Sequence, residues 1–109
     1  MSLNWKNDPD LSSKSDMDYL QDLIESLTSL LHSTPDDKVL LFRRGNAYLD
    51  KGKYEEAISD YSVIIGMDRS DSVSLNNRGI CLRCLGDPDN AIRDFNEAIQ
   101  LNNEYRDAY

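Results

Sequence analysis

Hydrophobic residues recur at intervals of three and four along most of the chain, the spacing that places them on one side of an α-helix. Gly52 and Gly86 interrupt this pattern where a helix can end in a left-handed residue. The pattern predicts five helices, over about residues 17–31, 35–51, 54–67, 72–85 and 88–101. No segment alternates between apolar and polar residues as a half-buried strand does. We therefore expect an all-α protein.

The start of the second predicted helix has several residues that favour a helix N-terminus. Thr34 can accept hydrogen bonds from the free amides of the first turn, and Pro35 suits that turn. Asp36 and Asp37 follow, where the positive end of the helix dipole favours acidic side chains. These residues predict that Thr34 caps the helix.

Two segments of the chain repeat one another with a period of 34 residues. A shift by 34 aligns Gly45 with Gly79, Gly52 with Gly86, Ala57 with Ala91, Ile58 with Ile92, Asp60 with Asp94, Tyr61 with Phe95 and Ile65 with Ile99. Such a register indicates two copies of one structural unit, over residues 38–71 and 72–105. Each unit contains two of the predicted helices.

Each unit carries a glycine in the middle of its first helix. Gly45 and Gly79 stand where glycine costs about 1 kcal/mol relative to alanine. A cost at the same place in both units indicates that another helix approaches closely there. We expect the small side chains of Ala57 and Ala91 to lie opposite, and the rings of Tyr61 and Phe95 to fill the gap beside them.

The repeated positions have a recognisable order. They are occupied by Leu41, Gly45, Tyr48, Ala57 and Tyr61 in the first unit and by Leu75, Gly79, Leu82, Ala91 and Phe95 in the second. In this order and spacing the units resemble the tetratricopeptide repeat. Arg69 and Asn103 replace the family's proline near the end of each unit, and Leu41 and Leu75 replace its large first residue. The resemblance implies an α-solenoid of antiparallel helix–turn–helix repeats.

The remaining segments extend this organisation. Residues 1–15 contain Pro9, four serines and scattered charges, which predicts a mobile tail. Residues 16–33 form an amphipathic helix that resembles the second half of a degenerate repeat. Residues 34–109 then hold about two full repeats and, from Glu104, the start of a third.

Composition narrows the range of functions. The chain has 109 residues and a net charge of -8, with a pI of about 4.4, which fits a single domain. An acidic protein does not favour nucleic-acid phosphates, and no apolar run approaches the length of a membrane span. Cys81 and Cys84 are too close in sequence to staple a small secreted fold, which favours a reducing, cytoplasmic setting.

Residues able to support catalysis or metal binding are few. Cys81 and Cys84 lie one turn apart late in a predicted helix, and His32, the only histidine, lies in another. A zinc site needs more ligands than these provide. We therefore expect Cys81 to pack in the interior, Cys84 to be partly exposed and His32 to lie at a helix C-terminus. The sequence predicts no enzyme activity and no cofactor.

The resemblance implies a function in binding protein or peptide partners. In the family, the first helix of each repeat lines a concave groove. The matching positions are Val39, Phe42, Asn46, Leu49, Asp50, Val73, Asn76, Asn77, Ile80 and Arg83, with Cys84 beside them. The amides of this set suit the backbone of an extended peptide, and the apolar members suit its side chains.

Two other interpretations remain open. Co-chaperone repeats hold a chaperone's C-terminal carboxylates with a clamp of lysines, asparagines and an arginine. Asn46 and Asn77 match the asparagines, but Phe42 and Asp107 occupy the lysine positions, and the arginine position lies beyond the last residue. The second alternative is homo-oligomerisation through the helices at 17–31 and 88–101.

Overall fold

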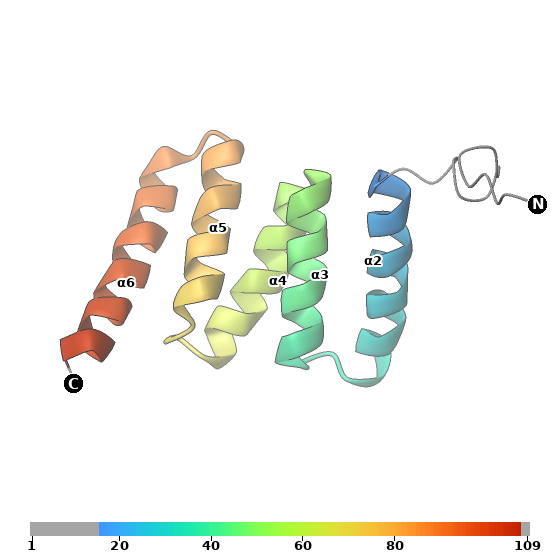
Figure 1. Cartoon of the computed structure of the whole chain (residues 1–109), viewed down its shortest axis with the longest axis horizontal. Coiled ribbons are helices and arrows are strands. Elements are labelled where there is room, and N and C mark those ends of the chain that lie inside the picture. The colour runs from blue at the N-terminus through green and yellow to red at the C-terminus, as the bar shows by residue number, and fades with distance from the viewer. Residues whose placement is uncertain (1–15, 108–109) are drawn as a thin grey trace, which may run out of the picture.

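The computed structural model describes residues 16–107 and the side chains of residues 16–102. This part of the chain forms five helices and no strand, which confirms the all-α prediction (Figure 1). The helices are α2 (Asp16–Ser33), α3 (Lys38–Lys51), α4 (Tyr54–Met67), α5 (Ser72–Cys84) and α6 (Pro88–Asp107). None of them is long and apolar enough to cross a membrane. The predicted tail at residues 1–15 lies outside the described residues.

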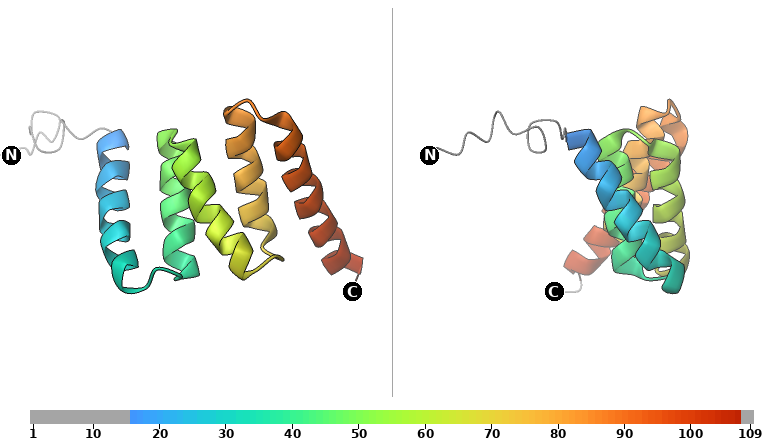
Figure 2. Two further views of the ribbon diagram at one scale, coloured as in Figure 1. Left: turned by 180° about the vertical axis from the view of Figure 1, so that it is seen from behind. Right: turned by 90° about the vertical axis from the view of Figure 1, so that its right-hand side faces the viewer.

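The helices stand side by side in a row, in the order of the sequence. Each helix packs on its neighbours in the chain, and a smaller contact joins α3 to α5. Figures 1 and 2 show α3 in front of α4 from one side and behind it from the other. One side of the molecule is therefore formed by α3 and α5, the first helices of the two repeated units.

The helix boundaries follow local sequence, with one correction at the start of α3. Asp37, not Thr34, is the N-cap of α3, because its carboxylate accepts a hydrogen bond from the Leu40 amide at 3.1 Å. Thr34 instead donates its hydroxyl to the carbonyl of Leu30 at the end of α2. Pro35 belongs to the turn between the two helices rather than to α3. Thus a residue three positions later than predicted supplies the cap.

Glycines end the first helix of each unit, as predicted. Gly52 and Gly86 have φ angles of 80° and 83°, a left-handed conformation that glycine adopts without steric cost. Gly52 ends α3 by donating its amide to the carbonyl of Leu49. Gly86 follows α5 and donates its amide to the carbonyl of Arg83. Both turns bring the second helix of a unit back against the first.

Gly45 and Gly79 lie where helices approach closely, as predicted. A Cβ atom on Gly45 would lie 2.9 Å from Cε1 of Tyr61, and one on Gly79 would lie 2.7 Å from Cε1 of Phe95. The rings of the second helices therefore pack directly on the backbone of the first. A continuous core surrounds these contacts, and its buried members are Leu31, Leu41, Ala57, Tyr61, Ile64, Ile65, Leu75, Cys81 and Ala98.

The C-terminal helix is longer than expected. We predicted that this helix ends near residue 101, but α6 continues without a break to Asp107 and includes Glu104, the first residue of the predicted third unit. The physical reason is that residues 101–107 contain no glycine or proline to stop a helix. Residues 108–109 lie outside the described range.

Candidate functional site

The structure brings three of the predicted groove residues together in one pocket. Val39 and Phe42 reach it from α3, and Val73 reaches it from the first turn of α5. The pocket has a volume of about 560 Å3, and Lys38, Arg43 and Asp71 complete its lining. Val39 and Val73 are exposed by 65% and 55%, so their apolar surfaces are open to a ligand.

Phe42 forms the inner wall of this pocket. Its ring packs edge-on against Tyr61, with 6.2 Å between centroids and an angle of 60° between the planes. Tyr61 is fully buried in α4 and contacts the backbone at Gly45. The wall is therefore held in place by the core rather than by a flexible loop.

A pair of amides lies further along the same two helices. The Oδ1 atom of Asn46 accepts two hydrogen bonds, from the Tyr61 hydroxyl at 2.6 Å and from Nδ2 of Asn77 at 3.2 Å. Burial raises the pKa of Tyr61, which keeps its hydroxyl protonated as a donor. Since both lone pairs of the Asn46 oxygen are used, this residue can offer a ligand only its Nδ2 donor.

The two basic residues of the pocket, Lys38 and Arg43, differ in whether carboxylates already bind them. Lys38 forms ion pairs with Asp68 at 2.9 Å and with Asp71 at 2.8 Å. Hydrogen bonds to these carboxylates raise the pKa of Lys38, and its charge is already matched. Arg43, which is exposed, forms no ion pair with any residue whose side chain is described. It is therefore the cation at the pocket that is available to a ligand.

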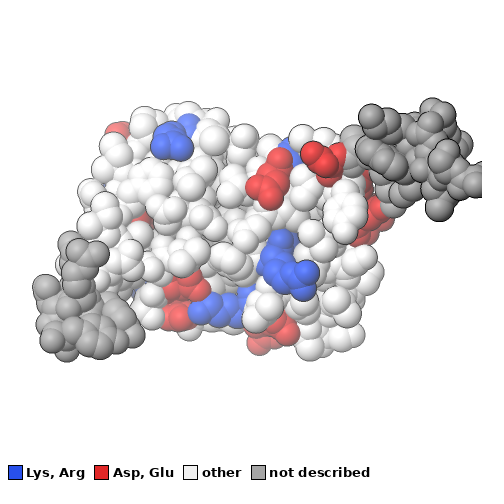
Figure 3. Space-filling view, in the orientation of Figure 1, with Lys and Arg blue, Asp and Glu red and all other residues white. Residues whose placement is uncertain are grey.

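Most of this side of the molecule is uncharged. Figure 3 shows Lys, Arg, Asp and Glu gathered in a few small clusters, with wide areas of other residues between them. Such a surface suits a ligand that contributes apolar and backbone contacts more than one recognised by charge alone.

The other predicted residues do not reach the pocket. Leu49 packs against the core, and Asp50 lines a separate hollow with residues of α2. Asn76 is exposed, Ile80 is half-buried, and the guanidinium of Arg83 lies 5.9 Å from the centroid of the Phe95 ring. Because Asp50 lies eleven positions after Val39 on α3, their Cα atoms are about 16 Å apart. The ten residues thus form a strip along two helices rather than one site.

Sequence reasoning missed the strongest polar contacts of the structure. The guanidinium of Arg44 binds both carboxylate oxygens of Asp60, at 2.8 and 2.7 Å, and that of Arg78 binds Asp94 in the same way at 2.7 and 2.9 Å. The carboxylates of both pairs are buried. The sequence does contain a signal for these pairs. In each pair the aspartate follows the arginine by 16 residues, and the second pair follows the first by 34 residues.

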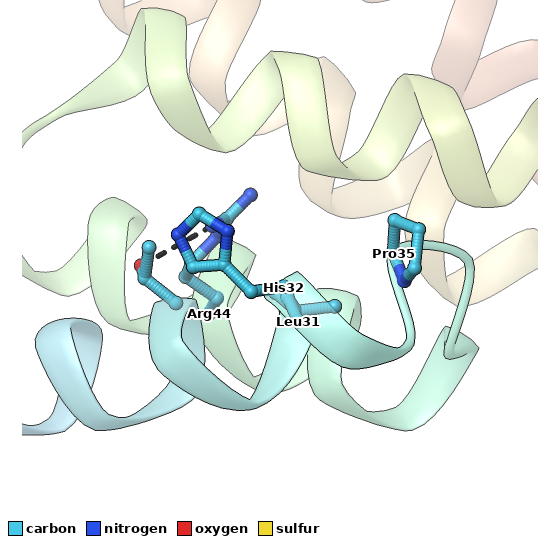
Figure 4. A pocket seen from close by; sticks show the side chains of 5 residues that line it. Leu31, His32, Pro35 and Arg44 are labelled. Carbon is cyan, nitrogen blue, oxygen red and sulfur yellow. Dashed lines mark hydrogen bonds between the residues drawn. The ribbon is translucent and has the colours of Figure 1, made fainter.

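Each of these arginines also joins its unit to the preceding helix. Nη1 of Arg44 donates to Thr28 at 3.2 Å, and Nη1 of Arg78 donates to Ser62 at 3.2 Å. Figure 4 shows the first of these bonds beside a pocket of about 270 Å3, which His32 and Pro35 also line. Arg44 is already bound by Asp60 and Thr28 at this pocket.

The cysteines lie as predicted. Cys81 is fully buried and Cys84 is exposed, and both are free thiols. Burial raises the pKa of Cys81 to about 11, which makes it a poor nucleophile. Within residues 16–102, no three His, Cys, Asp or Glu side chains are close enough to hold a metal ion.

Comparison with known proteins agrees with this architecture. Family models described as "Tetratricopeptide repeat" match residues 40–71 and 72–105. The small glutamine-rich tetratricopeptide repeat-containing protein of Dictyostelium discoideum is 36% identical over 69 residues, which are 63% of this chain and 21% of that protein. Stress-induced-phosphoprotein 1 of Caenorhabditis elegans is 26% identical over 99% of this chain and 33% of its own length. The chain thus spans a third or less of these relatives.

Solved structures show the same fold. The second tetratricopeptide repeat domain of Spaghetti (RPAP3), bound to the HSP90 peptide SRMEEVD, is 32% identical, with a TM-score of 0.71 over 75% of this chain and 76% of that one. MamA has a TM-score of 0.77 at 20% identity, over 85% of this chain and 54% of its own. The helical row, the 34-residue period and the two family matches lead to one conclusion. This chain belongs to the tetratricopeptide repeat family.

Proposed function

We propose that this chain is a non-catalytic interaction module that binds a peptide segment of another protein along α3 and α5. The observation that carries the proposal is the apolar pocket of Val39, Phe42 and Val73 next to the paired amides of Asn46 and Asn77. The pocket accepts an apolar side chain of the peptide. The Nδ2 donor of Asn46 is available to a carbonyl of its backbone.

The charged residues at the pocket indicate which kind of peptide it suits. Arg43 is available at its edge, whereas Lys38 is occupied by two carboxylates. We therefore propose that an acidic residue accompanies the apolar anchor of the peptide. The related Spaghetti domain, which binds the peptide SRMEEVD, supports an acidic peptide as ligand. A C-terminal carboxylate is the less favoured ligand, because Phe42 and Asp107 stand where the clamp of co-chaperone repeats has lysines.

The two unpaired thiols support a cytoplasmic setting, which we propose for this chain. Cys81 and Cys84 are both unpaired, and a reducing compartment such as the cytoplasm keeps them so. Self-assembly is the alternative function, since Leu30 on α2 and Ile99 on α6 are exposed at opposite ends of the row. Light scattering over a concentration series distinguishes the two functions, because only self-assembly raises the mass above that of one chain.

The peptide-binding proposal is tested by a charge placed in the pocket. Val73→Glu puts a carboxylate among apolar walls, and Val63→Glu makes the same change on α4, away from the pocket, at a valine of similar exposure. The probes are SRMEEVD and peptides selected on the unmodified chain from a displayed library. Burial of one apolar side chain contributes about 1.5–3 kcal/mol, so we expect at least tenfold weaker binding by Val73→Glu and no change with Val63→Glu.

Two results contradict the proposal. One is equal binding of the selected peptides by both variants, which places the peptide elsewhere. The other is a selection that yields no peptide at all. Circular dichroism of each variant checks that its helices are intact, and both valines are exposed enough for the fold to tolerate the change.

A further inference from the structure

A chain of hydrogen bonds links α3, α4 and α5 beside the apolar pocket. The hydroxyl of Tyr61 on α4 donates to Oδ1 of Asn46 on α3, and Nδ2 of Asn77 on α5 donates to the same oxygen. Tyr61 is fully buried, and Asn46 is the only acceptor of its hydroxyl hydrogen among the described residues. A buried hydroxyl without an acceptor is costly, so this bond fixes which end of the Asn46 amide faces Tyr61.

The Tyr61 hydroxyl therefore decides the direction of both amides. If the amides of Asn46 and Asn77 both turned over, they would still bond to each other, but the Tyr61 hydroxyl would lose its acceptor. In the orientation that the structure has, Nδ2 of Asn46 and Oδ1 of Asn77 bond to no described residue. Both residues are half-buried, and they offer one donor from α3 and one acceptor from α5.

One donor beside one acceptor matches the backbone of an extended peptide. In a strand, a single residue presents its N–H and its C=O on the same side of the chain, as in a hydrogen-bonded pair of antiparallel strands. The C=O of such a residue suits Nδ2 of Asn46, and its N–H suits Oδ1 of Asn77.

The distance between these amides and the apolar pocket sets where that residue lies in the peptide. Asn77 follows Val73 by four residues on α5, and Asn46 follows Val39 by seven on α3. At the rise of an α-helix, these separations are about 6–10 Å along the helix axes. An extended peptide covers that distance in two or three residues.

The second unit shows that helix packing does not require the hydroxyl. Phe95 occupies the position of Tyr61, and Ile80 occupies that of Asn46. The ring of Phe95 packs on the backbone at Gly79, as the ring of Tyr61 packs on the backbone of the first unit. Since a ring alone makes this contact, we attribute the hydroxyl of the first unit to the orientation of the amides.

We propose, building on the proposed function, that Tyr61 is a positioning residue that directs the amides of Asn46 and Asn77 towards the backbone of one peptide residue. The Tyr61 hydroxyl does not touch the peptide and acts through Asn46. Its effect is that the site requires a backbone N–H two or three residues from the apolar anchor. The ligand is therefore an extended segment without proline at that position, because proline has no backbone N–H.

The test replaces single backbone amides of a peptide by esters, which removes one N–H at a time. The peptide is one that is selected on the unmodified chain and weakened by Val73→Glu, and its binding is followed by fluorescence anisotropy. On the unmodified chain, we expect one ester, two or three residues from the anchor, to weaken binding about three- to tenfold. On Tyr61→Phe, we expect the parent peptide to bind about three- to tenfold more weakly, and the same ester to cost less than about twofold further.

Two other variants accompany Tyr61→Phe. Asn77→Ala removes the proposed acceptor without changing the core, so the same ester is expected to cost less than about twofold on this variant as well. Tyr48→Phe is the matched control, because Tyr48 is half-buried on α3 and its hydroxyl forms no hydrogen bond with a described residue. It is expected to change neither the affinity of the parent peptide nor the cost of the ester. Circular dichroism checks that each variant keeps its helices.

An ester that costs as much on Tyr61→Phe as on the unmodified chain would overturn this inference, as would the absence of any costly ester. Either result leaves the pocket as the site of binding, because the peptide is chosen by its response to Val73→Glu. If Val73→Glu weakens none of the selected peptides, the proposed function and this inference are both wrong.

Discussion

Single residues set the distance between the two helices of each unit. At Gly45, the backbone of α3 touches the ring of Tyr61, and no atom heavier than hydrogen fits between them. Tyr61 cannot move away, because it is fully buried and its hydroxyl is bonded to Asn46. Phe95, the equivalent ring beside Gly79, is only half-buried and has more freedom to shift. An added side chain is therefore tolerated less well at Gly45 than at the equivalent Gly79.

This difference gives a prediction for stability. Gly45→Ala gains about 1 kcal/mol in helix propensity, but it forces overlap with Tyr61 in a packed core, which costs about 1–3 kcal/mol. We expect a net loss of about 1–2 kcal/mol in the free energy of unfolding, measured by urea denaturation. Gly79→Ala is expected to lose less, although its overlap is closer.

Gly66→Ala serves as the control for this pair. Gly66 is exposed near the end of α4, and no atom lies within 4 Å of the point that an added Cβ would occupy. This substitution is expected to stabilise the protein by about 0.4–1 kcal/mol. Stabilisation by Gly45→Ala to the same degree would show that Tyr61 does not limit the approach of the helices.

Residue patterns predicted some of these features and missed others. The close helix approach at Gly45 and Gly79 followed from the 34-residue period, because a repeated cost has few explanations. The burial of Cys81 was expected for another reason, since the chain offers too few further ligands for a zinc site. The pairs Arg44–Asp60 and Arg78–Asp94 were not predicted, since their partners lie on different helices and charged residues on a helix are usually solvated. Only the geometry of the folded unit brings side chains 16 residues apart within hydrogen-bonding distance.

At the level of the elements, one lysine holds three helices together. Lys38 begins α3, and its two partners are Asp68, which ends α4, and Asp71, which caps α5. Asp71 also accepts a hydrogen bond from the Ser74 amide at 2.9 Å. Burial opposes ionisation of Asp71, but the bonds from Lys38 and Ser74 outweigh it and lower its pKa. Hydrogen bonds from Ser70 and Lys38 lower the pKa of Asp68 to about 2.

These shifts predict how stability depends on pH. An acid whose pKa is lowered on folding stabilises the folded state above its unfolded pKa, near 4, and this contribution is lost as the pH falls through the folded pKa. Asp71→Asn keeps a good cap but removes the charge. We expect this variant to be less stable than the unmodified chain by about 0.5–1 kcal/mol at pH 7, and the difference to disappear towards pH 2.

Asp37→Asn is the matched control, because Asp37 caps α3 in the same way without contacting a lysine in the described structure. The difference in stability between this variant and the unmodified chain is expected to change little between pH 7 and pH 2, because the Lys38 ion pairs are present in both. Denaturation at several pH values measures both variants. Identical pH dependence of the two would contradict a role for the Lys38 ion pairs.

The positions of the elements were predictable to within a few residues, but the details at their ends were not. The prediction of α4 was correct at both ends, since an apolar stripe between two turn signals defines it. The start of α3 was misplaced because Thr34 and Asp37 are both good caps, and tertiary contacts decide between them. Val39, Phe42 and Val73 were predicted as groove positions, but their grouping in one pocket was not, because it depends on how α3 and α5 pack.

On the scale of the whole molecule, contacts are made almost entirely between neighbours in the row. α4 is covered by helices on both sides, whereas α2 and α6 each have only one neighbour within the described part of the chain. Stability in such arrays is the sum of local units and their interfaces, so it need not be uniform. The ends are expected to open more often than the centre.

Hydrogen exchange of the backbone amides measures this directly. We expect the slowest exchange in α4, and the fastest in the first turns of α2 and the last turns of α6. Equal protection of all five helices would mean that the chain unfolds as one cooperative unit instead.

The two cysteines of α5 can serve as a chemical probe of such opening. Cys84 is exposed, so we expect it to react with an alkylating reagent in the native state. Cys81, one turn earlier, is enclosed between helices and has a raised pKa, so we expect it to react only when α5 opens. A single modification therefore marks a molecule that has stayed closed, and a double modification marks one whose second repeat has opened at least once. Mass spectrometry of the singly and doubly alkylated chains over time therefore measures how often the second repeat opens, without any substitution in the chain.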